Sequence, residues 1–76
     1  MEDSKILELY WSRDQQAIAE TRASYGSPLL ALAERILSSR EDAEETVSDT
    51  FLRVWQTIPP ERPRCFFAFL RRICRN

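Results

Sequence analysis

Five arginines and no acidic residue occupy the last fifteen positions of the chain, residues 62–76. Guanidinium groups bind phosphate through charge-assisted hydrogen bonds, so this stretch, named the arginine segment, has the chemistry of a polyanion-binding site. Residues 62–76 carry a formal charge of +5, whereas residues 1–61 carry −6. Phe67 in the same segment is either a platform on which a base stacks or a packing residue, under the neighbouring loop or against a continuation of the chain. The arginines are Arg62, Arg64, Arg71, Arg72 and Arg75.

Groups suited to catalysis or metal binding are scarce. The chain has no histidine, and its carboxylates lie at expected helix starts and exposed positions instead of converging as an acid–base pair. Cys65 and Cys74 lie nine residues apart, which is not a metal-ligand spacing, and we interpret both as reduced packing residues. We therefore predict a binding protein that is not an enzyme and needs no cofactor or metal.

A helix over residues 41–58 is the element around which the other segments must pack. Apolar side chains recur along it at helical spacing and predict one buried side. A capping box that begins at Ser38 or Ser39 marks the start of the helix, and Pro59 marks its end. The residues of the predicted buried side are Val47, Phe51, Val54, Trp55 and Ile58.

A second stripe on this helix consists of acidic and polar residues and one leucine, and we name it the polar face. Its members repeat at the same helical spacing, so they share a side that differs from the buried one. We interpret the polar face as a protein-binding surface, and the alternative is a solvated helix side with a stray leucine. Its residues are Glu45, Ser48, Asp49, Leu52 and Gln56.

The first third of the chain predicts two more elements. A short helix or turn near the N-terminus should bury Tyr10 and Trp11. A capping box that begins at Ser12 should open a helix that runs to about Ser24. Gly26, the only glycine, stands where a helix C-cap would use the left-handed conformation.

Ser27 and Pro28 suit the N-cap and first position of a further helix, which we expect to end at Ser38. The last helix follows a proline-rich loop and occupies residues 65–76. No strand signal is present. The predicted fold class is therefore all-α, a compact three- to four-helix bundle that forms a single domain over residues 1–76. The helix that begins at Pro28 should bury Leu29, Leu30, Ala33, Ile36 and Leu37.

The length of 76 residues suffices for one small domain, and no apolar stretch approaches the length of a membrane span. The N-terminal sequence MEDSKILELYW is acidic and lacks a long apolar run, so we expect no signal peptide. These features favour a cytoplasmic location and no membrane contact.

Three segments of the chain resemble region 2 of the sigma factors of bacterial RNA polymerase, within the sigma-70 family and its extracytoplasmic-function type. They are YGSPLLALAERIL, DAEETVSDTFLRVW and FFAFLRRICRN, in the order and spacing of that family, and the resemblance covers about residues 12–76. It implies a domain that binds core RNA polymerase and melts promoter DNA in transcription initiation. The polar face then matches the surface that presses against the clamp helices of the polymerase β′ subunit.

The resemblance also implies a DNA-binding part. Residues 57–64 and the last helix match the region that captures unstacked bases of the minus-ten promoter element on the non-template strand. The arginines of the arginine segment would bind phosphates, and Asn76 matches a position near the flipped-base pocket. The family usually has Gln at the position of Ser48. The last helix has Phe69 and Arg71 where Trp and Tyr are common, which weakens the expectation of base stacking there.

The resemblance stops before the rest of the melting region and before the helix-turn-helix, region 4, that reads the minus-thirty-five element. We therefore expect a domain fragment that is truncated at its C-terminus. An anti-sigma factor is a further expected partner. The alternative function is a non-catalytic helical scaffold that binds an anti-sigma partner or self-associates.

Overall fold

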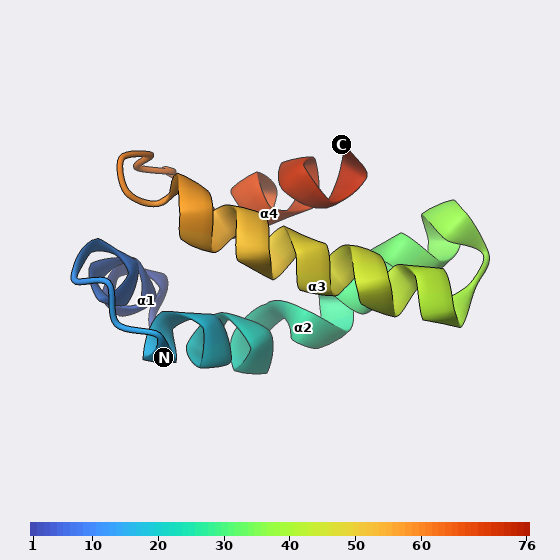
Figure 1. The fold of residues 1–76 in the computed structure, drawn as a ribbon, viewed down its shortest axis with the longest axis horizontal. Helices are drawn as coiled ribbons and strands as arrows, with labels where there is room; N and C mark the ends of the chain where they lie inside the picture. Colours follow the sequence, from blue (N-terminus) through green and yellow to red (C-terminus); the bar gives the residue numbers. More distant parts are fainter.

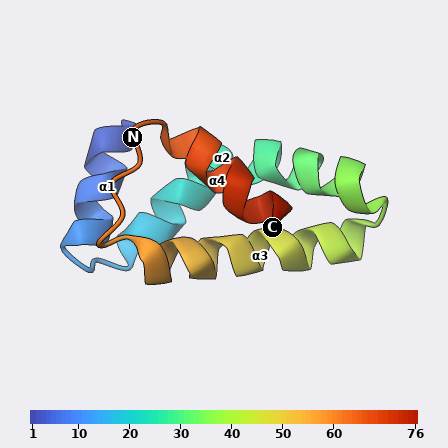
Figure 2. The ribbon, with the colours of Figure 1, turned by 90° about the horizontal axis from the view of Figure 1, so that it is seen from above.

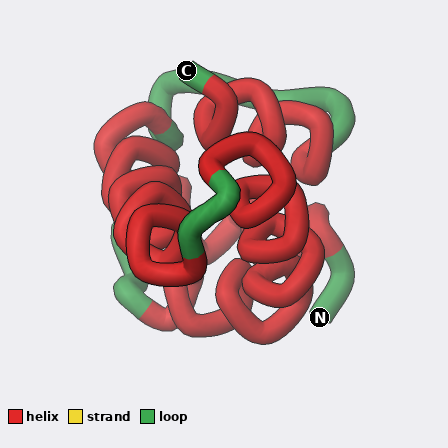
Figure 3. Tube along the Cα trace, turned by 90° about the vertical axis from the view of Figure 1, so that its right-hand side faces the viewer, coloured by secondary structure: helices red, strands yellow, loops and turns green.

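The computed structural model describes residues 1–76 and contains four α-helices and no strand. The helices are α1 (Asp3–Trp11), α2 (Gln16–Leu37), α3 (Arg40–Thr57) and α4 (Phe66–Arg75). In Figure 1, α2 and α3 run antiparallel along the long axis, α4 lies over them, and α1 crosses one end. Figure 3 views the bundle end-on from the short turn between α2 and α3. The predicted all-α helical bundle is confirmed.

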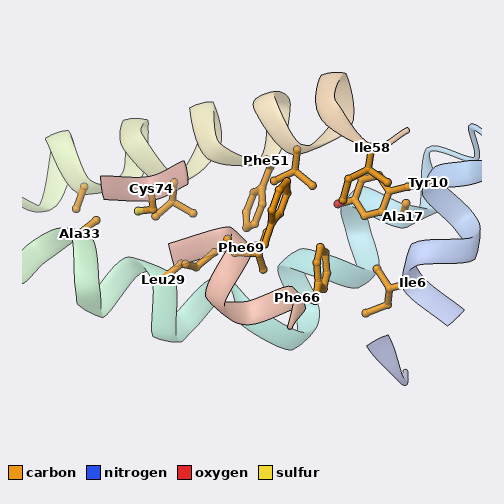
Figure 4. Close-up of a cluster of buried hydrophobic side chains, with 14 residues drawn as sticks. Ile6, Tyr10, Ala17, Leu29, Ala33, Phe51, Ile58, Phe66, Phe69 and Cys74 are labelled. Atoms are coloured by element: carbon orange, nitrogen blue, oxygen red, sulfur yellow. The ribbon is translucent and has the colours of Figure 1, made fainter. Parts of the chain in front are cut away.

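The core is formed by side chains from all four helices (Figure 4). The predicted buried side of α3 faces this core, except that Trp55 is only partly buried. Tyr10 of α1 fits between α3 and α4, with its ring centroid 6.2 Å from that of Trp55 and 6.0 Å from that of Phe66. Its buried hydroxyl forms a 2.6 Å hydrogen bond with the hydroxyl of Thr21. Each helix is therefore stabilised by its neighbours, as a bundle of this size requires.

The N-terminus of α3 is capped by Ser39, as in the second of the two predicted capping boxes. The Oγ atom of Ser39 accepts a hydrogen bond of 3.3 Å from the backbone N–H of Asp42. Ser38 instead ends α2 in the left-handed conformation, with φ 56°. At the other end, Ile58 is extended and precedes Pro59, which stops α3 as predicted.

The predicted break in the middle of α2 is wrong. Gly26 and Pro28 lie inside one continuous helix, and Gly26 does not have a positive φ. Buried positions on α2, including Thr21 and Leu29, continue across Pro28 on one side, so packing against α3 favours an unbroken helix over the local helix-stop signal. The proline bends the helix, and in Figure 2 the cyan and green halves of α2 run in different directions.

The predicted capping box at Ser12 is also wrong. Ser12 Oγ donates to the carbonyl of Leu9, and it is Asp14 Oδ1 that accepts from the backbone N–H of Gln16 at the start of α2. Asp14 lies two residues before Gln16, whereas a capping box requires a spacing of three. The start of α2 is therefore capped by Asp14 and not by the predicted box at Ser12.

Several predicted core residues are exposed. The exposed fractions are 38% for Trp11, 51% for Ile36 and 40% for Leu37. Trp11 follows the buried Tyr10 and lies on a different side of α1, whereas Ile36 and Leu37 are the last two residues of α2. Cys65 is exposed in the loop and only Cys74 is a packing residue. None of the four helices is both long and apolar enough to cross a bilayer.

We expect Gly26→Ala to stabilise the protein by about 0.5–1 kcal/mol, because Ala loses less backbone entropy in a helix interior. A Cβ atom at Gly26 would meet only Arg22 Cγ at 3.5 Å, an ordinary contact. Urea unfolding monitored by circular dichroism measures the change. A loss of stability would mean that residue 26 adopts the left-handed conformation of a C-cap after all.

Candidate functional site

The polar face of α3 lies on the side of the helix opposite the core. All five of its residues are exposed, and the exposed fraction of Leu52 is 53%. Their side chains form none of the hydrogen bonds or ion pairs found along α3, which belong to its first turn, to its threonines and to Arg53. Glu41 is exposed and falls on the same side by helical spacing, so the face extends one turn further than predicted.

A groove of about 780 Å³ lies between the second half of α2 and α4. Three guanidinium groups line it, from Arg35 on α2 and from Arg71 and Arg75 on α4. None of these arginines has an ion-pair partner. Glu34 also lines the groove, but its carboxylate pairs with Arg40 at 3.3 Å. The groove therefore presents an excess of positive charge to any ligand.

Arg35 was missed because its position in the sequence lies in the acidic part of the chain. Only the folding of α2 against α4 brings it opposite Arg71 and Arg75. The only sequence feature that points to Arg35 is a charged residue at an exposed helix position, and other surface arginines share that feature.

Phe67 at the edge of the groove is half-buried and packs within the chain. Its ring stacks on Tyr25 with centroids 5.0 Å apart and an angle of 12° between the planes. The guanidinium of Arg71 lies 5.3 Å from the same ring centroid. Little of the ring is thus free to receive a base, and Phe67 supports Arg71 through a cation–π contact.

The other predicted site residues of the arginine segment do not line the groove. Arg62 lies over the ring of Trp11, 4.0 Å from its centroid, at the α1 end of the molecule. Arg72 lies 5.5 Å from the ring centroid of Phe69. Asn76 lines a small cavity of about 100 Å³ that it shares with Asp49 on the polar face. Arg64 is exposed in the loop and has no partner.

The two groups with shifted acidity are tyrosines that serve packing. Burial raises the pKa of Tyr10, and its hydrogen bond with Thr21 opposes that rise. The hydroxyl of Tyr25 donates to Asp3 Oδ1 at 2.6 Å, and this bond, with burial and the charge of Asp3, raises the pKa of Tyr25 to about 12. Both phenols therefore stay neutral at physiological pH, and neither lines the groove.

A comparison with protein families identifies the larger part of the chain. The family described as Sigma-70 region 2 matches residues 22–76, which include most of α2 and all of α3 and α4. No significant match was found among curated proteins or among solved structures. The polar face and the groove both lie inside the matched segment, whereas α1 lies outside it. The chain belongs to the sigma-70 region 2 family, a non-enzymatic domain of transcription initiation factors that binds RNA polymerase and takes part in promoter melting.

Proposed function

We propose that this domain belongs to a cytoplasmic sigma factor of the extracytoplasmic-function type and docks on the β′ clamp helices of RNA polymerase through its polar face. The observation that supports this assignment is the exposure of all five polar-face residues, opposite the buried side of the same helix. An exposed leucine within a ring of polar groups is the composition of an interface centre with a hydrated rim. The domain's own core does not need this face, so the face is available to a partner.

We further propose that the arginine segment and the groove contact the non-template strand of the minus-ten element. Arg71 and Arg75 are one helical turn apart, about 6 Å along the axis, so each can bind a different phosphate. Arg35 faces them from α2 and adds a third cation to the same path. A cationic groove suits a strand whose bases have left the duplex stack, because phosphate contacts offset part of the cost of unstacking.

The test of the DNA proposal is the salt dependence of binding to a labelled single-stranded oligonucleotide of mixed sequence, measured by fluorescence anisotropy. Each phosphate contact contributes about 0.7 to the slope of log affinity against log salt for single strands. We expect Arg35→Ala, Arg71→Ala and Arg75→Ala each to lower this slope by about 0.7.

Lys5→Ala is the matched control, since Lys5 is exposed on α1, has no ion-pair partner and lies away from the groove. It removes the same charge and should leave the slope unchanged. Equal slopes for the three groove variants and Lys5→Ala would count against the groove as the DNA path.

A further inference from the structure

The N-terminal segment, residues 3–13, lies outside the family match yet contacts a loop within it. We name residues 59–65, between α3 and α4, the proline loop. Figure 2 shows this loop running alongside α1. Two arginine–tryptophan contacts connect the N-terminal segment to this region. One joins Trp11 to Arg62 in the proline loop, and the other joins Arg13 to Trp55 near the end of α3, just before the loop.

The first contact holds the entrance to the proline loop. One terminal nitrogen of Arg13 donates to the carbonyl of Trp55 at 2.8 Å and to the carbonyl of Ile58 at 3.0 Å. These carbonyls lie at the C-terminal end of α3, where backbone acceptors lack partners within the helix. The same guanidinium lies 3.7 Å from the centroid of the Trp55 ring. Arg13 thus caps the end of α3 that Pro59 sets, and it holds the direction in which the loop leaves the helix.

The second contact holds the middle of the proline loop. Arg62 lies 4.0 Å from the ring centroid of Trp11, the last residue of α1. Trp11 and Pro63 line the same surface pocket, which has a volume of about 410 Å³ and lies between α1 and the loop. A guanidinium stacked on a ring keeps its N–H groups directed outward in its own plane, so Arg62 can still bind phosphate while it is held.

The backbone at Arg13 indicates that its side chain has a specific use. Arg13 has φ 57°, and the bonds from its N–H to the Tyr10 carbonyl and from the Asp14 N–H to the Leu9 carbonyl form a Schellman motif. Glycine is the residue that this position favours, and a side chain there adds strain. Ser38 has the same backbone conformation, φ 56°, but its side chain forms no hydrogen bond.

We infer that the N-terminal segment is a positioning element, in which Arg13 and Trp11 hold the proline loop so that Arg62 and Arg64 face the DNA. The contacts themselves are properties of the fold, and only their link to DNA rests on the proposed function. Arg13 and Trp11 are positioning residues and do not touch the ligand themselves.

The experiment compares Arg13→Gly with Ser38→Gly in the full chain. Both substitutions remove the backbone strain of a non-glycine residue in the left-handed conformation. Only Arg13→Gly also removes the hydrogen bonds to the end of α3. Trypsin cleavage after Arg64 reports how often the loop opens. We expect about tenfold faster cleavage in Arg13→Gly, and parental cleavage with a raised melting temperature in Ser38→Gly. Equal cleavage in the two variants would overturn the inference.

Two further measurements separate positioning from folding and from charge. Trp11→Ala removes the ring on which Arg62 lies and keeps the Arg13 side chain that binds the end of α3, so it should also speed cleavage after Arg64 while the helical signal is retained. Arg13→Gly should weaken single-strand binding more than Lys5→Ala, which removes the same charge, and should leave binding to polymerase unchanged. If the parent binds no DNA, the proposed DNA function fails, while the cleavage result still decides whether the loop is held.

Discussion

Leu52→Asp is expected to abolish binding of the chain to the β′ clamp helices. Leu52 is 53% exposed at the centre of the polar face, so a partner that covers this face must desolvate residue 52. Losing a buried leucine costs an interface about 1.5–3 kcal/mol, and an unpaired carboxylate in its place adds a desolvation penalty. Together these terms exceed about 3 kcal/mol, which corresponds to a loss of affinity of more than about a hundredfold.

The chain offers a matched control in Leu37→Asp. Leu37 is 40% exposed at the end of α2 and lies on a surface with no assigned partner. Both variants remove one exposed leucine and add one charge, so they differ only in position. Pull-down with the purified β′ clamp helices should retain the parent and Leu37→Asp and lose Leu52→Asp and Asp49→Arg. Equal retention of all four proteins would show that polymerase binds elsewhere.

The properties of α3 could be predicted from sequence because its signals agree with one another. A serine cap, acids in the first turn, an apolar stripe and a following proline all favour the same helix, so its two sides could be assigned before the neighbours were known. Trp55 is the exception on the buried side. It is only partly buried because one of its ring faces is covered by the Arg13 guanidinium and not by the core.

The features that sequence reasoning missed all depend on long-range contacts. Gly26 and Pro28 are local stop signals, and packing of α2 along α3 outweighs them. Arg35 belongs to the groove only because α4 folds back on α2, and Arg13 caps a helix more than forty residues away. No spacing rule connects such pairs, so their roles become visible only in the folded chain.

Phe51→Ala tests the buried side of α3. We expect this substitution to lower the stability of the fold, whereas Leu52→Asp should lower binding and leave stability nearly unchanged. Phe51 is 2% exposed, and the Arg22 guanidinium lies over its ring, 5.0 Å from the ring centroid. Truncating a buried phenylalanine costs about 3–5 kcal/mol, from lost burial and from the cavity that remains. In a domain of this size each kcal/mol lowers the melting temperature by about 4–8 °C, so we expect a fall of about 12 °C or more.

Substitutions at two adjacent residues of α3 therefore distinguish an effect on folding from an effect on binding. Leu52→Asp should melt within about 4 °C of the parent, because exposed substitutions usually change stability by less than about 0.5 kcal/mol. Phe51→Leu keeps most of the buried volume and should recover much of the stability that Phe51→Ala loses. Thermal unfolding followed by circular dichroism at the same protein concentration measures all three variants. A Phe51→Ala protein that melts like the parent would mean that α3 does not bury this side, and the polar face would then lose its position opposite the core.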